Sequence, residues 1–184
     1  MVAIALFQKN SYLYYTITPN GRWFFIGVTA ILTIVAPLFS AGYLLYSKQI
    51  SSLEMEDRKE RLLPMAISGA YIFGLYYLFS TFNLPSTIMA ITGVGVVGTI
   101  ITLFITFFWK ISAHMIAFSS LSAVVVVLSE SIHPVPTYII MTLFISTGLI
   151  GWARLQLKAH SLEQVLAGWL VGFVLAYLVM MILM

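Results

Sequence analysis

The sequence predicts an all-α membrane protein, a bundle of six transmembrane helices with a short interfacial segment near the N-terminus. Hydrophobic residues make up 61% of the 184 residues and charged residues only 8%, whereas a soluble domain carries roughly 25% charged residues. The chain also contains six long apolar segments, each close to the roughly 20 residues that a helix needs to cross a bilayer. Because no repeat or low-complexity linker separates them, we expect a single domain over residues 1–184.

The elements follow from the apolar segments and the residues between them. Tyr12–Tyr15 suits a segment lying at the membrane interface, and Pro19-Asn20-Gly21 is typical of a turn. Pro37 is expected to kink the first span, and Pro64 suits the first turn of the second. The predicted spans are Trp23–Tyr46, Leu62–Phe82, Thr87–Trp109, His114–Leu128, Thr137–Trp152 and Leu162–Leu183.

Glycines predict where spans approach one another closely. Gly168 and Gly172 in the sixth span have the G-x-x-x-G spacing that lets two helix backbones come into contact. Three glycines thin one face of the third span in the same way: Gly93, Gly95 and Gly98.

Composition excludes several classes of function. The chain has no cysteine, which excludes disulfides and thiolate metal sites. Its three histidines lack the spacing of a metal site, so we expect neither a metal nor another cofactor. The net charge of +3 is small, and nothing in the sequence favours nucleic acid as a partner.

The few charged residues are expected to gather on one side of the membrane. With six spans, the first, third and fifth connections share a side, and His114 and His160 lie there too. An excess of Lys and Arg favours the cytoplasmic side of a membrane. Because several of these cations are also candidate phosphate ligands, the side of the membrane that they face stays open. Seven of the nine Lys and Arg residues belong to this side: Lys48, Arg58, Lys59, Arg61, Lys110, Arg154 and Lys158.

The first candidate group precedes the sixth span. His160 lies just before the predicted start of that helix, where free backbone N–H groups and the helix dipole favour an anion. Arg154 and Lys158 add positive charge, and histidine is a competent nucleophile toward phosphorus. A structural interpretation is also open, because Ser161 and Gln164 form an S-x-x-Q capping box.

The second candidate group, Lys110-Ile-Ser112-Ala-His114, joins the third and fourth spans. A histidine at this point is able to protonate a leaving oxygen as a general acid, and the Ser112 hydroxyl suits a phosphate oxygen. The alternative is an ordinary histidine at the membrane interface.

The third candidate group precedes the second span. Arg58 and Arg61 suit bidentate contacts with a phosphate. The alternative is a solvated loop, because four acidic residues offset the four cations of residues 48–61: Glu54, Glu56, Asp57 and Glu60. By topology all three groups reach one membrane face, and ionisable groups clustered in so apolar a chain indicate a functional site.

These residues resemble the type 2 phosphatidic acid phosphatase family of membrane lipid phosphatases, whose motifs are K-x6-R-P, P-S-G-H and S-R-x5-H-x3-D. Arg154-x5-His160 has the spacing of the third motif, and residues 164–168 resemble its continuation. Ser112-Ala113-His114 resembles the second motif, with alanine in place of glycine. The resemblance extends loosely over residues 57–172.

The resemblance implies hydrolysis of the phosphate or pyrophosphate headgroup of a lipid in the bacterial inner membrane, without a metal. Phosphatidic acid, phosphatidylglycerol phosphate and undecaprenyl pyrophosphate are substrates of this kind. It implies that His160 is the nucleophile that becomes phosphorylated and that His114 is the acid for the leaving alcohol. It also implies that Arg154, Ser112 and Arg61 hold the phosphate. The residues themselves add Arg58 and Lys158 as candidate ligands.

The chain departs from the family pattern at three points. Ala153 replaces the serine of the third motif, and the first motif is degenerate, with Glu54 at its lysine position. Gln164 replaces the aspartate that would hold the other nitrogen of the nucleophilic imidazole; a glutamine oxygen still accepts the Nδ1–H but supplies no charge. These departures motivate an alternative function, a catalytically weak relative that binds a lipid headgroup or acts as a subunit of a membrane complex.

Overall fold

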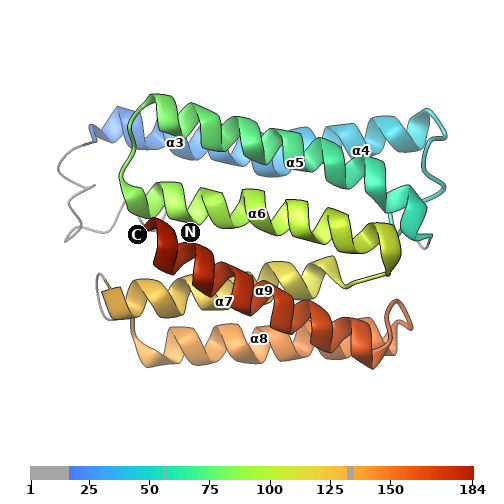
Figure 1. Cartoon of the computed structure of the whole chain (residues 1–184). Helices are drawn as coiled ribbons and strands as arrows, with labels where there is room; N and C mark the ends of the chain where they lie inside the picture. The colour runs from blue at the N-terminus through green and yellow to red at the C-terminus, as the bar shows by residue number, and fades with distance from the viewer. Residues whose placement is uncertain (1–16, 56, 132–134) are drawn as a thin grey trace. The chain divides into compact units, whose positions relative to one another are not determined.

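The computed structural model describes residues 17–55, 57–131 and 135–184 (Figure 1). Within these ranges the chain is helical and contains no strand, which confirms the predicted fold class. The predicted interfacial segment, including Tyr12–Tyr15, lies outside the described residues. Six helical spans of the described chain are long and apolar enough to cross a membrane: Pro19–Tyr46, α5 (Arg58–Thr81), α6 (Ser86–Phe108), α7 (Ala113–Ser131), α8 (Thr137–Gln156) and α9 (Leu162–Leu183).

The chain forms two compact units that divide within α6, between Val96 and Val97. The first unit contains the Pro19–Tyr46 span, α5 and the first half of α6. The second contains the rest of α6 with α7, α8 and almost all of α9. The single domain expected from the sequence stays a prediction.

The first span departs from a regular α-helix just before Pro37, and the kink expected at Pro37 stays a prediction. The span consists of α3 (Pro19–Ala30), a π-helical segment η1 (Ile31–Val35) and α4 (Ala36–Tyr46). A proline has no N–H for the preceding turn, and its ring crowds the carbonyl four residues back. The helical turn just before Pro37 is wider than an α-helical turn, because the Ala36 N–H donates to the Ile31 carbonyl, five residues back.

The prediction of a turn at Pro19-Asn20-Gly21 is wrong, because these residues form the first turn of α3. Thr18 caps the helix, and its hydroxyl accepts a hydrogen bond from the Gly21 N–H at 3.2 Å. Pro19 occupies the first helical position, where the missing N–H has no intrahelical partner to lose. Proline and glycine therefore mark a helix start here rather than a connection.

The predicted place of Pro64 in the first turn of the second helix is also wrong. The helix α5 begins at Arg58, so Pro64 lies inside it. Asp57 is the N-cap, and its carboxylate accepts a hydrogen bond from the Lys59 N–H at 3.0 Å. The charged residues before the apolar run are thus helical, and α7 and α8 likewise extend past the predicted ends at Leu128 and Trp152.

The core of the first unit is aromatic and aliphatic. Phe25 of α3 packs edge-to-face on Phe79 of α5, with ring centroids 5.6 Å apart. Between α4 and α5 the hydroxyls of Ser40 and Tyr71 are hydrogen-bonded at 2.7 Å. The buried core of this unit comprises Phe25, Leu75, Phe79, Leu84 and Ile88.

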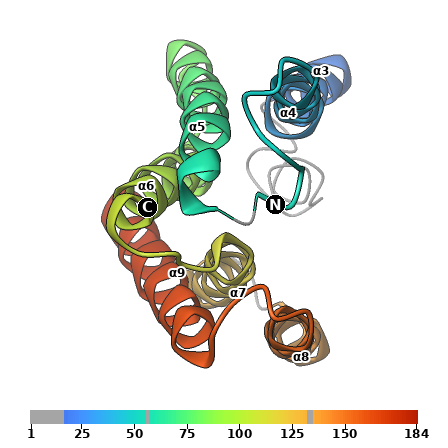
Figure 2. The same ribbon diagram turned by 90° about the vertical axis from the view of Figure 1, so that its right-hand side faces the viewer.

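Helix α7 is the centre of the second unit. Half of the residues in the most apolar stretch of α7 are buried, whereas only 6% of the residues in the corresponding stretch of the first span are buried. Figures 1 and 2 show α8 and α9 beside α7, with the start of α7 and the α8–α9 turn at the same end. The Ser120 hydroxyl of α7 donates to the Gly172 carbonyl of α9 at 2.9 Å, and Ser122 lies 3.4 Å from the Thr147 hydroxyl of α8.

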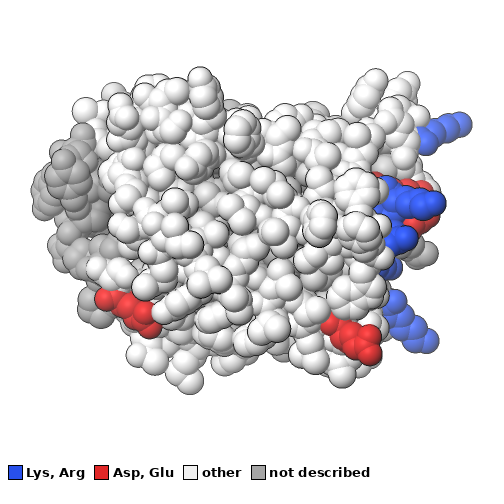
Figure 3. Space-filling model, viewed as in Figure 1, with Lys and Arg blue, Asp and Glu red and all other residues white. Residues whose placement is uncertain are grey.

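The charged side chains lie at helix ends. In Figure 3 the sides of the helices are white on the face shown, and Lys, Arg, Asp and Glu appear only near the ends. Large apolar side chains are exposed along these sides, among them Phe104, Leu166 and Leu170. Such a surface suits the hydrocarbon of a bilayer, which has no water to solvate charge.

Candidate active site at the ends of α7, α8 and α9

Three helices of the second unit meet at the end that carries His160. A Cβ built on Gly151, in the last two turns of α8, would lie 3.2 Å from Val165 of α9 and 3.4 Å from the Met115 sulfur of α7. All three residues are buried. Because this contact involves one residue from each helix, it fixes the start of α7, the end of α8 and the start of α9 close together.

The G-x-x-x-G pair of α9 packs on the start of α7, as its spacing predicts. A Cβ on Gly168 would lie 2.8 Å from the Ser112 carbonyl oxygen, and one on Gly172 would lie 2.7 Å from the Ile116 Cα atom. Gln164 precedes Gly168 by four residues, so it lies on the same face of α9 one turn nearer the start of the helix. One turn of helix, about 6 Å, thus separates Gln164 from the residue that touches Ser112.

His160 lies in the α8–α9 turn, half-buried, and its ring is held by Gln164. The His160 Nδ1 atom is 2.9 Å from the Gln164 Oε1 atom. The same Oε1 atom accepts a hydrogen bond from the Ser161 N–H at 3.3 Å, and the Ser161 hydroxyl accepts one from the Gln164 N–H at 3.4 Å. The capping box and the imidazole contact are therefore present together.

Ser112 immediately precedes α7 and is fully buried. Its carbonyl accepts the Ile116 N–H at 3.1 Å, which makes it the first acceptor of that helix. Its hydroxyl oxygen has no hydrogen-bond partner among the described residues. A buried hydroxyl without a partner costs roughly 1–3 kcal/mol, so this position is prepared for a polar ligand atom or a water molecule.

His114 is the second residue of α7 and is exposed at the same end of the unit as His160. Ser112 is the residue before the first residue of α7, and His114 is the residue after it, so the two lie next to the helix start along the chain. An exposed imidazole at a helix end is accessible to a substrate that approaches from the headgroup region.

Arg154 lies in the last turn of α8, although the sequence predicted that it follows that helix. It is half-buried, and its carbonyl accepts the Ala159 N–H at 3.1 Å. Together with the bond from the Lys158 N–H to the Leu155 carbonyl at 3.0 Å, this forms a Schellman motif that ends the helix. The chain thus passes from the end of α8 to His160 within four residues, 157–160.

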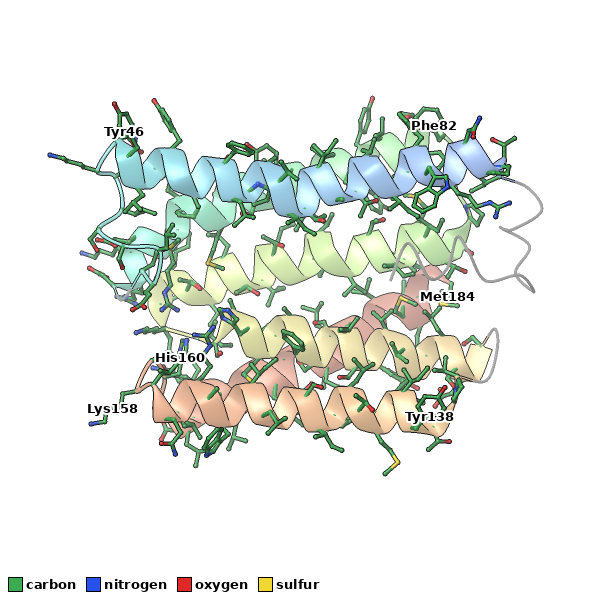
Figure 4. The ribbon with its side chains drawn as sticks, turned by 180° about the vertical axis from the view of Figure 1, so that it is seen from behind. Tyr46, Phe82, Tyr138, Lys158, His160 and Met184 are labelled. Atoms are coloured by element: carbon green, nitrogen blue, oxygen red, sulfur yellow. The ribbon has the colours of Figure 1, made fainter. Side chains whose placement is uncertain are left out.

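Lys158 occupies the position of this motif that is usually glycine, and its φ is 51°. The side chain is exposed and projects away from the helix end in Figure 4, while His160 lies nearer the start of α7. A non-glycine residue in this conformation carries steric strain of roughly 1–2 kcal/mol. Lys158 therefore contributes charge at the rim of the site and some strain to the turn.

The substitution Lys158→Gly is expected to raise the free energy of unfolding by about 0.5–1 kcal/mol, because glycine adopts this conformation without a Cβ clash. Lys158→Met removes the same charge and keeps the Cβ, so it is expected to leave stability unchanged or lower it. Thermal unfolding of the two variants in one detergent measures the difference. Equal midpoints would show that the φ of 51° carries no strain.

Arg58 and Arg61 belong to the first unit, in the first turn of α5. The Arg61 Nε–H donates to the Met55 carbonyl at 2.7 Å, and Glu60 accepts hydrogen bonds from the Ser51 N–H and hydroxyl at 3.1 and 2.8 Å. These contacts fold the preceding loop onto the start of α5. Arg61 therefore has a structural contact in addition to its predicted role toward phosphate.

Sequence reasoning named the candidate residues of the second unit but missed one contact there. The contact of Gly151 with α7 and α9 had only a weak signal, a small residue near the end of an apolar segment. The Ser161 N–H contact with the Gln164 side chain was implicit in the S-x-x-Q pattern. In the described ranges no group of three or more potential metal-ligating side chains occurs. No protein-family model, curated protein or solved structure matches the chain.

Proposed function

We propose that this protein hydrolyses the phosphate or pyrophosphate headgroup of a membrane lipid through a phosphorylated histidine, His160. The observation that supports this most is the 2.9 Å contact between His160 Nδ1 and Gln164 Oε1. A nucleophilic imidazole needs a partner that holds one ring nitrogen so that the other faces the substrate. The proposal also draws on the resemblance of Arg154-x5-His160 and Ser112-Ala113-His114 to lipid phosphatase motifs.

The proposed reaction has two steps, in which the phosphoryl group passes first to His160 and then to water. The lone pair of His160 Nε2 forms a bond to phosphorus, and the bond from phosphorus to the leaving oxygen breaks with its electron pair on that oxygen. His114 supplies the proton that this oxygen takes up. Water then attacks the phosphohistidine, its proton passes to His114, and inorganic phosphate leaves with Nε2 regaining its lone pair.

Charge and hydrogen bonding are supplied by residues around the two histidines. Arg154 and Lys158 offset the negative charge of the phosphoryl oxygens, which a helix N-terminus such as that of α9 also favours. The buried Ser112 hydroxyl, which has no partner among the described residues, would donate to one of these oxygens in the complex with substrate.

The membrane supplies the substrate in this proposal. The exposed apolar sides of α8 and α9 suit contact with acyl or prenyl chains, and charged groups near the helix ends suit lipid headgroups. The test is release of inorganic phosphate by purified protein in detergent containing a metal chelator. A panel of phosphatidic acid, phosphatidylglycerol phosphate and a prenyl pyrophosphate identifies the headgroup class, and dependence on His160 assigns the release to this protein.

A catalytically weak protein that binds a lipid headgroup, or acts as a subunit of a membrane complex, is the second candidate function. It is favoured by the neutral side chain of Gln164, whose oxygen also serves the cap of α9. An amide offers no negative charge to stabilise an imidazolium, and in serine proteases the change from Asp to Asn in this role costs about 10⁴ in turnover.

The substitution Gln164→Asp distinguishes the two functions. In the enzyme, a carboxylate at this position is expected to raise phosphate release about fivefold or more, because hydrogen bonds to a charged group are worth roughly 1 kcal/mol more than neutral ones. Gln164→Asn is the matched control, since it shortens the side chain equally without adding charge. No gain with Asp over Asn on any lipid phosphate would favour the binding function.

A further inference from the structure

The side chain of Gln164 has two orientations that differ in which atom faces His160. With Oε1 toward the ring, Nδ1 must donate a proton; with the NH₂ group toward the ring, Nδ1 must accept one. These two orientations select opposite tautomers of the neutral imidazole. The aspartate expected from the resemblance has two equivalent oxygens and only one such state, so the glutamine creates a requirement that aspartate does not have.

The capping box decides between these orientations. The Ser161 backbone N–H lies 3.3 Å from the same Gln164 atom that contacts the ring. A backbone N–H only donates, so the atom between it and the ring has to be the acceptor oxygen. The Ser161 hydroxyl in turn accepts the Gln164 N–H at 3.4 Å, which holds the first turn of α9 in place.

We propose that Ser161 is a positioning residue, whose backbone N–H fixes the Gln164 oxygen and thereby holds neutral His160 as the Nδ1–H tautomer. The lone pair is then on Nε2, the nitrogen that attacks phosphorus, so the catalytic meaning of this inference rests on the proposed function. The tautomer itself is a property of the protein without substrate. The helix cap of α9 and the reactivity of His160 are thus coupled through one amide oxygen.

The experiment is ¹⁵N nuclear magnetic resonance of protein labelled at histidine, in detergent and without substrate, above the pH at which the ring loses its extra proton. Long-range proton–nitrogen correlations distinguish the protonated from the unprotonated ring nitrogen, and His160→Asn assigns the signal. Wild-type protein is expected to show the Nδ1–H tautomer at His160. The Nε2–H tautomer there would overturn the proposal.

Two variants of Ser161 separate the N–H from the hydroxyl. Ser161→Ala and Ser161→Pro both lose the hydroxyl, but only proline loses the N–H, and the φ of −79° at this position suits proline. Alanine is expected to keep the Nδ1–H tautomer, and proline to give a mixture of both tautomers. The same tautomer in both variants would overturn the role of the N–H.

Two variants of Gln164 test the proposal independently of the fold of the proline variant. Gln164→Glu turns an acceptor oxygen toward the ring in either orientation of the side chain, and is expected to retain the Nδ1–H tautomer. Gln164→Met keeps the length of the side chain without an acceptor, and is expected to give a mixture. A wild-type spectrum for the methionine variant would overturn the proposal. None of these spectra depends on phosphate release, so failure of the proposed function would be seen separately.

Discussion

The substitution His160→Ala is expected to reduce phosphate release to the level of substrate without protein. The expected loss is about 10⁶-fold, which is the order seen when the nucleophile of another covalent enzyme is removed. The reason is that Nε2 forms the only covalent bond to phosphorus in the proposed reaction, and no neighbouring side chain replaces it. The measurement is inorganic phosphate released from lipid phosphates by wild-type and variant protein purified in the same detergent.

His114→Ala is the matched control, since it removes an imidazole from the same end of the second unit. It is expected to cost about 10²–10⁴-fold with a lipid phosphate, whose leaving oxygen needs a proton. With p-nitrophenyl phosphate, whose leaving group needs no proton, the loss is expected to be far smaller. His160→Ala is inactive on both substrates if the roles are right, and activity that survives this substitution would refute them.

The substitution Gly172→Leu is expected to prevent folding of the second unit or to destabilise it severely. A Cβ at this position would lie 2.7 Å from the Ile116 Cα atom and closer still to the Ile116 carbonyl oxygen and the Ser119 hydroxyl. Two of these atoms are backbone, so α7 itself would have to move. That movement would also break the 2.9 Å hydrogen bond from Ser120 to the Gly172 carbonyl. Overpacking alone costs typically 1–3 kcal/mol.

Gly148→Leu is the control for this prediction. Gly148 lies in α8, and nothing comes within 4 Å of a Cβ built there. Leucine in this helix is expected to leave stability unchanged or to raise it slightly, because glycine is the weaker helix former by roughly 0.5–1 kcal/mol. Size-exclusion profiles and thermal unfolding in detergent compare the two variants. Similar behaviour of Gly172→Leu and Gly148→Leu would show that α7 and α9 do not pack through Gly172.

Helix existence was predictable from the sequence, and some helix limits were predictable as well, among them the start of α8 at Thr137. The start of α9 at Leu162 was predicted correctly because Ser161 and Gln164 form a capping box before an apolar run. The starts of α3 and α5 were not, because Pro19 and Arg58 are polar or turn-forming residues outside the apolar run. Apolarity marks the part of a helix that lies in lipid, whereas hydrogen bonding and capping decide where the helix ends.

The candidate site divides in the same way. The sequence alone indicated His160, Gln164, Arg154, Ser112 and His114, because their spacing resembles known motifs and because ionisable groups are costly in so apolar a chain. It did not indicate that the Ser112 hydroxyl is buried without a partner, or that one glutamine oxygen serves both the helix cap and the imidazole.

The sequence by itself determined that this protein lies in a membrane as six helices, since 8% charged residues do not cover a soluble surface. It also determined which helix ends carry the candidate site residues. Only the tertiary structure decided how α7, α8 and α9 meet at those ends. The physical reason is that close approach depends on Gly151, Gly168 and Gly172 fitting against particular atoms of α7 and α9, and a one-dimensional pattern contains no such distances.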